Sequence, residues 1–171
     1  MRDHLDRIVA RFQATIPSVD FCSLRFMHTR SEYLSVRQHI LQPVSTSEDT
    51  GAMITVIDKG GLGYAGTSDL TESGLRRATA HAQAWARQSA GRSVIDYATV
   101  ARPHPTGEYA SPVQLPWSDV PLSDKINLLR TTSEQLKTED RIVDWEASLW
   151  HTESNTLFVT ADGGRVHQTF S

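Results

Sequence analysis

The sequence contains one glycine pattern that is known from nucleotide-binding proteins. Gly61-Leu-Gly-Tyr-Ala-Gly66 spells G-x-G-x-x-G, which binds a dinucleotide when it forms the turn between a strand and a helix. Here the next predicted helix starts several residues too late, and the acidic residue expected about 20 positions further on is missing. A β-hairpin explains these glycines better, so we predict no cofactor-binding residue in this chain.

Two histidines and a glutamate near the C-terminus are candidates for a metal site. His151 and Glu153 are two positions apart on a predicted strand and share a face, and His167 follows on a later strand. A zinc site needs three or four convergent ligands, which this spacing alone does not establish. The sequence has no helical zinc motif, no G-x-S-x-G and no phosphate-binding loop. A small metal-dependent hydrolase using these three residues is one alternative, although we predict no metal ligand.

Other reactive side chains have ordinary structural interpretations. Cys22 alternates with Leu24 and Phe26 on the apolar face of a predicted strand, which favours a buried thiol over a nucleophile. Asp144 and Glu146 share a strand face, and a hydrated outer face is the usual setting for such a pair. We therefore predict no catalytic residue.

Four residues are candidates for contact with a peptide or a partner. They are a glycine in the predicted hairpin and three aromatic residues: Gly63, Tyr64, Trp117 and Trp150. Small hairpin residues let another backbone approach closely, and exposed aromatic side chains are enriched at interfaces. For Trp117 the alternative is that it holds its own loop against the sheet.

Composition narrows the class of protein. The chain has 171 residues, a net charge of −3 and a single cysteine. Its length suits one domain, predicted as 1–171, and its scattered basic residues argue against a nucleic-acid partner. The charged N-terminus is unlike a signal peptide, and no apolar run approaches the length of a membrane span. We expect a cytoplasmic protein without a membrane partner.

Hydrophobic periodicity predicts an α+β protein with a mixed, largely antiparallel sheet and two to three helices packed on it. Asp69 and Glu72 have the spacing of a capping box before the second helix, and Ser123 is the predicted cap of the third. The predicted turns are 28–31, the neighbourhood of Pro43, Asp58-Lys-Gly-Gly and Ala161-Asp-Gly-Gly. The expected helices are 3–15, one that Asp69 and Glu72 open and that runs over 75–90, and one from 123. The expected strands are 20–27, 33–38, 40–45, 52–57, 62–67 and three within 141–171, and a proline-rich connection covers 101–121.

With these residues in place, the chain resembles the amino-terminal domain of TldD/PmbA proteins, also called modulators of DNA gyrase. The resemblance rests on a strand, a glycine turn and a helix start, carried by Gly51, Val56, Gly60, Gly63, Tyr64, Ala65, Thr67, Ser68, Asp69 and Leu70. Met53, Thr55 and Gly66 depart from the usual residues of the family, which leaves the TldD-like or PmbA-like subtype open.

The resemblance implies a zinc metallopeptidase that acts on unfolded or peptide substrates. The zinc-binding His-Glu-x-x-x-His helix of the family lies in a carboxy-terminal domain, and the motif does not occur in this sequence. We therefore expect zinc in that other domain, and we expect this chain to shape the peptide-access chamber and the subunit contacts. The implied partners are its own carboxy-terminal domain, a homo- or heterodimeric family partner, and unfolded peptide. A free-standing interaction module without peptidase activity is the second alternative.

Overall fold

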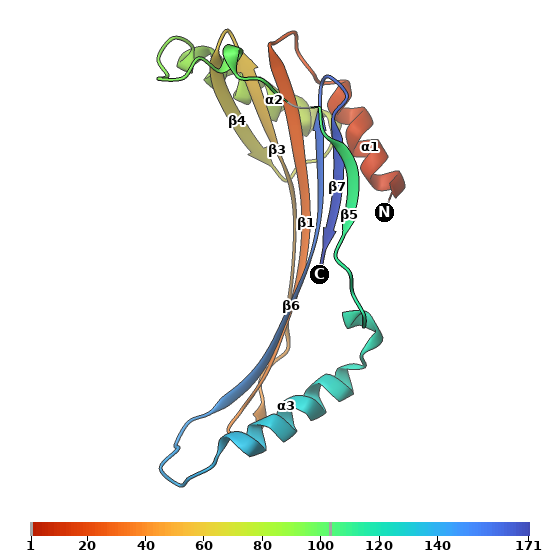
Figure 1. Cartoon of the computed structure of the whole chain (residues 1–171), viewed down its shortest axis with the longest axis vertical. Coiled ribbons are helices and arrows are strands. Elements are labelled where there is room, and N and C mark those ends of the chain that lie inside the picture. The colour runs from red at the N-terminus through yellow and green to blue at the C-terminus, as the bar shows by residue number, and fades with distance from the viewer. Residues whose placement is uncertain (1, 103) are drawn as a thin grey trace. The chain divides into compact units, whose positions relative to one another are not determined.

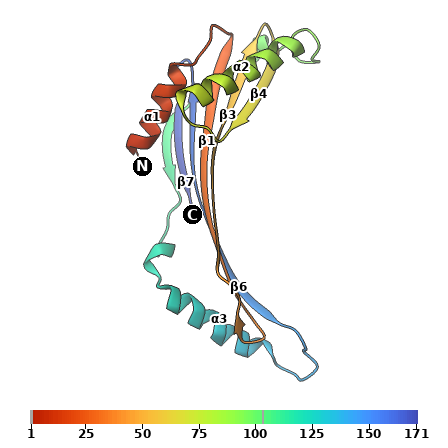
Figure 2. The same ribbon diagram turned by 180° about the vertical axis from the view of Figure 1, so that it is seen from behind.

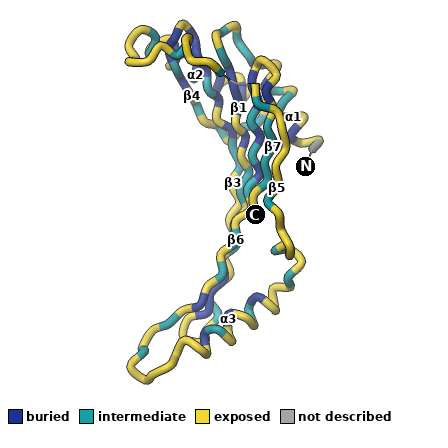
Figure 3. The backbone as a smooth tube through the Cα atoms, in the orientation of Figure 1, coloured by how far each residue is buried: buried dark blue, intermediate teal, exposed yellow. Residues whose placement is uncertain are grey.

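The computed structural model describes residues 2–102 and 104–171, which form two compact units (Figure 1). Unit 1 consists of Met1–His28, Asp49–Tyr109 and Asn155–Thr169, and unit 2 consists of Thr29–Glu48, Ala110–Ser154 and Phe170–Ser171. Each unit has its own apolar core, and Figure 3 shows the buried positions of the chain in dark blue.

The helices and strands confirm the predicted α+β class. The helices are α1 (Arg2–Gln13), α2 (Glu72–Ser89) and α3 (Leu122–Leu136), with 3-10 helices η1 (Tyr97–Thr99) and η2 (Trp117–Asp119). The strands are β1 (Phe21–Arg37), β2 (Ile40–Leu41), β3 (Ser45–Asp58), β4 (Gly61–Thr67), β5 (Thr106–Ala110), β6 (Glu146–Thr160) and β7 (Arg165–Phe170). The sheet order is β4-β3-β1-β6-β7-β5, with β2 beside β1.

The N-terminal strands are longer than predicted. The predicted turn at 28–31 is wrong, because β1 continues through it to Arg37. The segment has no glycine or proline to end a strand, and its polar side chains have partners on neighbouring strands. In unit 1 His28 Nδ1 lies 2.7 Å from Thr50 Oγ1, and in unit 2 Ser31 Oγ lies 3.0 Å from Thr152 Oγ1.

The actual reversal follows β1. Gln38 and His39 have φ angles of 49° and 67°, which make a tight turn, so His39 is a turn residue. The predicted strand over 40–45 is wrong, since β2 covers only Ile40–Leu41 and β3 begins at Ser45.

Two further expectations need correction. Residues 141–171 contain two strands instead of three, because β6 runs without a break from Glu146 to Thr160. The connection over 101–121 is not extended throughout, since it contains β5 and η2. The predicted turn at Ala161-Asp-Gly-Gly is confirmed, because it joins β6 to β7.

The core of unit 1 lies between the sheet and two helices that cover the same face of it (Figure 2). Its fully buried side chains include Phe12 of α1, Leu24 of β1 and Leu75 of α2. Cys22 is completely buried in this core, and burial raises the pKa of its thiol to about 12. The prediction of a buried structural thiol is confirmed.

The predicted β3–β4 hairpin is also confirmed. Asp58 pairs with Gly61 across the two-residue turn, where Lys59 and Gly60 have φ angles of 54° and 76°. The G-x-G-x-x-G segment therefore forms strand β4 and not a strand-to-helix turn. Helix α2 occupies the space that a side chain would need at Gly63, where an added Cβ would lie 2.1 Å from the Ala82 carbonyl oxygen.

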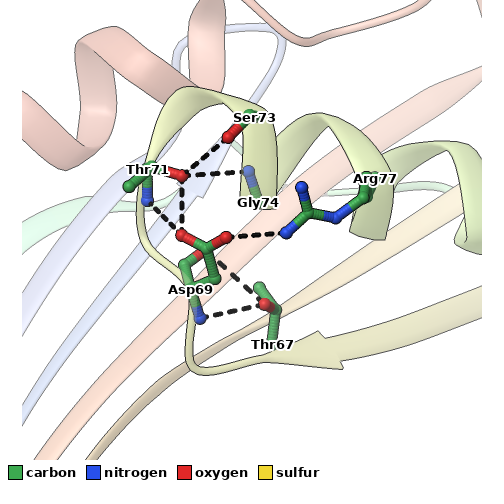
Figure 4. A network of polar contacts seen from close by, with 6 residues as sticks. All are labelled: Thr67, Asp69, Thr71, Ser73, Gly74 and Arg77. Carbon is green, nitrogen blue, oxygen red and sulfur yellow. Dashed lines mark hydrogen bonds and ion pairs between the residues drawn. The ribbon is translucent and has the colours of Figure 1, made fainter.

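The N-terminus of α2 is capped differently from the prediction (Figure 4). The Thr71 hydroxyl accepts a hydrogen bond from the Gly74 N–H at 3.1 Å and is therefore the N-cap. Asp69 supports this cap by accepting from the Thr71 N–H at 3.1 Å, and it pairs with Arg77 at 2.7 Å. Glu72 forms an ion pair with Arg76 instead of closing a capping box.

Helix α3 begins differently from its prediction. Pro121 precedes it with a φ of −55° and no side-chain cap, so Ser123 lies inside the first turn. Its buried face carries Lys125, Leu129 and Ser133, whereas Leu136 is exposed. Leu129 packs in the core of unit 2 with residues of β1 and β6. Among the described residues, no helix combines the length and apolar character needed to cross a membrane.

An ion pair that joins the β3–β4 hairpin to α2 gives the first prediction. Arg87 Nε donates to Asp58 Oδ2 at 2.8 Å, and Gln83 donates to the same oxygen. The Arg87 hydrogen bond is the largest cause that holds the pKa of Asp58 below its usual range. Because the folded-state pKa is the lower one, this group stabilises unit 1 above about pH 4, and that contribution is lost as pH falls through the folded-state pKa. We expect Asp58→Asn to reduce the loss of the free energy of unfolding as pH falls below about 4, measured by urea denaturation at a series of pH values. If the variant loses stability at low pH as steeply as the unaltered chain, the contribution of Asp58 is contradicted.

Candidate functional site

A pocket of about 520 Å³ in unit 2 is the candidate functional site. Three residues singled out from the sequence line it: Trp117, His151 and Glu153. Its charged lining also includes Arg30, Glu32 and Lys125, and its apolar rim includes Val113, Val120 and Leu122. The pocket therefore combines both signs of charge with apolar surface.

The indole of Trp117 is the centre of this site. The ring of His151 stacks on it with centroids 4.8 Å apart and an interplanar angle of 8°. Lys125 Nζ lies 3.8 Å from the centroid of the same indole, close enough for a cation–π interaction. The indole Nε1–H donates to Glu32 Oε2. Four elements thus meet at one side chain: η2, β6, α3 and β1.

Lys125 and Glu32, which both contact the indole, also form an ion pair with each other. Nζ and Oε2 are 3.5 Å apart, and the side chains are 7% and 23% exposed, respectively. A lysine this deeply buried needs a charged or polarisable partner, and here it has both Glu32 and the face of Trp117. These contacts hold the connection before α3 against the sheet of unit 2. The structural interpretation of Trp117 is therefore supported, although the residue also lines the pocket.

The two acidic side chains that share a strand face, Asp144 and Glu146, also have partners. Arg37 Nε donates to Asp144 Oδ1 at 2.8 Å, and this contact is the largest cause that lowers the pKa of Asp144. Hydrogen bonds from Ser35 and Tyr33 lower the pKa of Glu146. Both carboxyl groups are thus held ionised by structural contacts. A general acid at neutral pH needs a raised pKa, which neither group has.

The suggested metal group is not assembled. His151 belongs to unit 2 and stacks on Trp117, whereas His167 belongs to unit 1, where its Nε2 is buried without a hydrogen-bond partner. Within residues 2–102 and 104–171, no three side chains of the His, Cys, Asp or Glu types come together in a way that could hold a metal ion. The structure gives no support to a hydrolase built on His151, Glu153 and His167.

The remaining contact candidates lie elsewhere. Gly63 is covered by α2, so the backbone approach that its size allows is already used by the chain itself. Tyr64 in unit 1 is 66% exposed, and Trp150 in unit 2 is 75% exposed. Trp85 has the helical spacing of the apolar face of α2, which predicts burial, yet it is 61% exposed. The backbone of α2 at Ala82 and Ala86 lies against Gly63 of β4.

Sequence reasoning missed Glu32 and Lys125. Both are charged residues in amphipathic segments, and such residues are usually solvated. One signal was available: Lys125 falls on the same helical face as Leu129, four positions later.

Comparison with known proteins agrees with this fold. A model of the family described as PmbA/TldA metallopeptidase domain 1 matches residues 22–86. A structure from Thermotoga maritima, described as a candidate modulator of a DNA gyrase, superposes with a TM-score of 0.70 at 14% identity and covers 99% of this chain. TldE from Thermococcus kodakarensis gives 0.67 at 17% identity over 99% of this chain. A candidate modulator of DNA gyrase from Bacteroides thetaiotaomicron gives 0.67 at 13% identity over 96%. No curated protein matches the chain significantly.

The chain thus shares the fold of a part of each of these solved chains, and the family match over residues 22–86 agrees with the residues recognised in the sequence. The family model over residues 22–86 and the three similar structures together support a TldD/PmbA amino-terminal domain in this chain. The chain spans 37%, 36% and 37% of the three solved chains, respectively.

Proposed function

We propose that this chain is a non-catalytic domain of a TldD/PmbA-type metallopeptidase, which shapes the path of a peptide toward a metal site in another domain. The observation that carries the proposal is the cluster around Trp117. Side chains that could do chemistry, His151 and Glu32, serve there to build the wall of a pocket. Zinc chemistry and subunit pairing belong to the family, and we extend them to a protein containing this domain as part of the same proposal.

The lining of the pocket suits a peptide. Arg30 and Glu153 supply both signs of charge at its exposed surface, and Val113 and Leu122 supply apolar contacts. An extended peptide carries backbone amides and alternating side chains, which such a mixed surface can accept without one dominant charge.

Substitution at the rim tests this role in the peptidase that contains the chain. Leu122 lines the pocket and is 47% exposed, at the first turn of α3. A carboxylate is tolerated at a helix N-terminus, so Leu122→Asp should preserve the fold while changing the pocket. We expect KM for an unfolded peptide substrate to rise about tenfold, equivalent to ~1.4 kcal/mol, with kcat nearly unchanged.

Leu128→Asp is the matched control, because Leu128 lies on the same helix, is 57% exposed and does not line the pocket. If both variants change KM equally, or neither changes it, the pocket has no part in handling peptide.

The exposed indole of Trp150 supports a second candidate, a protein-interaction module. It lines a shallow pocket of about 340 Å³ in unit 2 with Tyr33 and three serines, a surface composition compatible with a protein partner. Trp150→Ser should weaken subunit association in sedimentation measurements if this surface is used. Unchanged association would remove this candidate.

A further inference from the structure

Among the residues that the structure describes, one edge of the sheet in unit 1 has no neighbouring strand. Strand β4 is terminal in the strand order (Figures 1 and 2). The register with β3 begins at the Asp58–Gly61 pair, which closes the two-residue turn. In an antiparallel ladder the paired residues alternate. Gly61, Gly63, Ala65 and Thr67 therefore bond to β3, while Leu62, Tyr64 and Gly66 direct their backbone groups outward.

Part of this edge is already occupied by the chain. Ser89 Oγ donates to the Leu62 carbonyl oxygen at 2.8 Å, which caps the edge near the turn. The outward N–H and C=O groups of Tyr64 and Gly66 remain. Two donors and two acceptors at alternate residues are what a second extended strand requires.

A groove beside this edge could take a side chain. It has a volume of about 530 Å³ and is lined by Leu62, Tyr64, Trp85, Gln88 and Arg92, among others. Tyr64 and Trp85 are the large exposed side chains there, at 66% and 61%. Helix α2 packs so closely on β4 that an added Cβ at Gly63 would lie 2.8 Å from the Trp85 Cβ. This close packing holds Trp85 beside the groove.

The positive charge of the groove favours extended segments that carry a carboxylate. Arg92 is the one ionised group among the described residues that line it, and no carboxylate accompanies it. A ligand with a carboxylate beside its apolar side chain would pair with this guanidinium.

We propose that the free edge of β4 binds an extended peptide segment by strand addition. A large apolar side chain of that segment enters the groove between Tyr64 and Trp85, and a neighbouring carboxylate pairs with Arg92. This surface belongs to unit 1 and is independent of the pocket proposed above in unit 2.

Fluorescence anisotropy with the whole chain tests the proposal. The probe is a short fluorescein-labelled peptide of threonine and valine with a central phenylalanine and a nearby aspartate. Gly66→Pro removes the outward N–H of β4 and leaves the bonds to β3 in place, as proline on an edge strand allows. We expect the Kd to rise about tenfold. Gly66→Ala keeps the N–H, and the added Cβ would have 4.0 Å to its nearest neighbour, so it should bind like the unaltered chain.

Two further comparisons keep the test decisive if Gly66→Pro fails to fold. The same peptide with N-methyl groups on alternate residues should lose affinity for the unaltered chain, because it cannot pair with an edge. Arg92→Gln should weaken the aspartate peptide several-fold and leave its asparagine analogue unchanged. The proposal is overturned if the probe does not bind saturably, or if N-methylation leaves the Kd unaltered. Equal binding of the aspartate and asparagine peptides would overturn the role of Arg92.

Discussion

Replacing Gly63 with alanine should lower the free energy of unfolding by about 3 kcal/mol, at the upper end of the usual cost of overpacking. The added Cβ would lie 2.1 Å from the Ala82 carbonyl oxygen and 2.4 Å from the Ala86 backbone nitrogen. Backbone atoms of a helix cannot turn aside as a flexible side chain can, so α2 would have to move away from β4. That movement would open the core of unit 1, where Ala82 and Ala86 are completely buried.

Gly66→Ala is the control for this prediction. It makes the same chemical change on the same strand, but the nearest atom to its Cβ would be the Ala52 carbonyl oxygen at 4.0 Å. Its effect should stay within about 0.5 kcal/mol. Urea denaturation followed by far-UV circular dichroism measures both variants. Equal stability of the two would show that α2 does not pack on β4 at this close distance.

Replacing Glu32 with alanine should destabilise unit 2 by roughly 2–3 kcal/mol, toward the lower end for a broken buried ion pair because Glu32 retains some exposure. The substitution leaves the ammonium of Lys125, whose side chain is 7% exposed, with the face of Trp117 in place of its ion-pair partner. It also leaves the indole N–H of Trp117 without its acceptor. The connection before α3 should then loosen from the sheet of unit 2.

Glu153→Ala is the matched control, since Glu153 is an exposed carboxylate that lines the same pocket. Its effect should remain within about 0.5 kcal/mol. Glu32→Gln should fall between the two, because it retains an acceptor for the indole and loses the charge. Tryptophan fluorescence during urea denaturation reports on both the indole and the global transition. If Glu32→Ala is as stable as Glu153→Ala, the cluster does not hold the connection.

Local signals predicted the parts of the fold that local chemistry determines. The Asp58-Lys-Gly-Gly turn was predictable because a two-residue hairpin turn needs positive φ angles, which the structure has at Lys59 and Gly60. The lengths of β1 and β6 were not predictable, because their polar middle residues are kept in strands by partners distant in sequence. Ser31 and Thr152 illustrate this, as they are 121 positions apart.

The candidate pocket was only half predictable for the same reason. Trp117 and His151 attract attention by residue type alone. Glu32 and Lys125 acquire a role only when β1 and α3 bring them to the same indole. Residue type indicated chemistry at His151, whereas its stacking geometry indicates support of the pocket wall.

The central claim is that this domain handles peptide and leaves the chemistry to another domain. The most direct test is to purify the chain, equilibrate it with zinc, remove unbound metal, and measure bound zinc together with hydrolysis of an unfolded protein substrate. The proposed role predicts no stoichiometric zinc and no hydrolysis above the buffer rate, while a labelled extended peptide still binds. Stoichiometric zinc accompanied by hydrolysis, both abolished by His151→Ala, would contradict it.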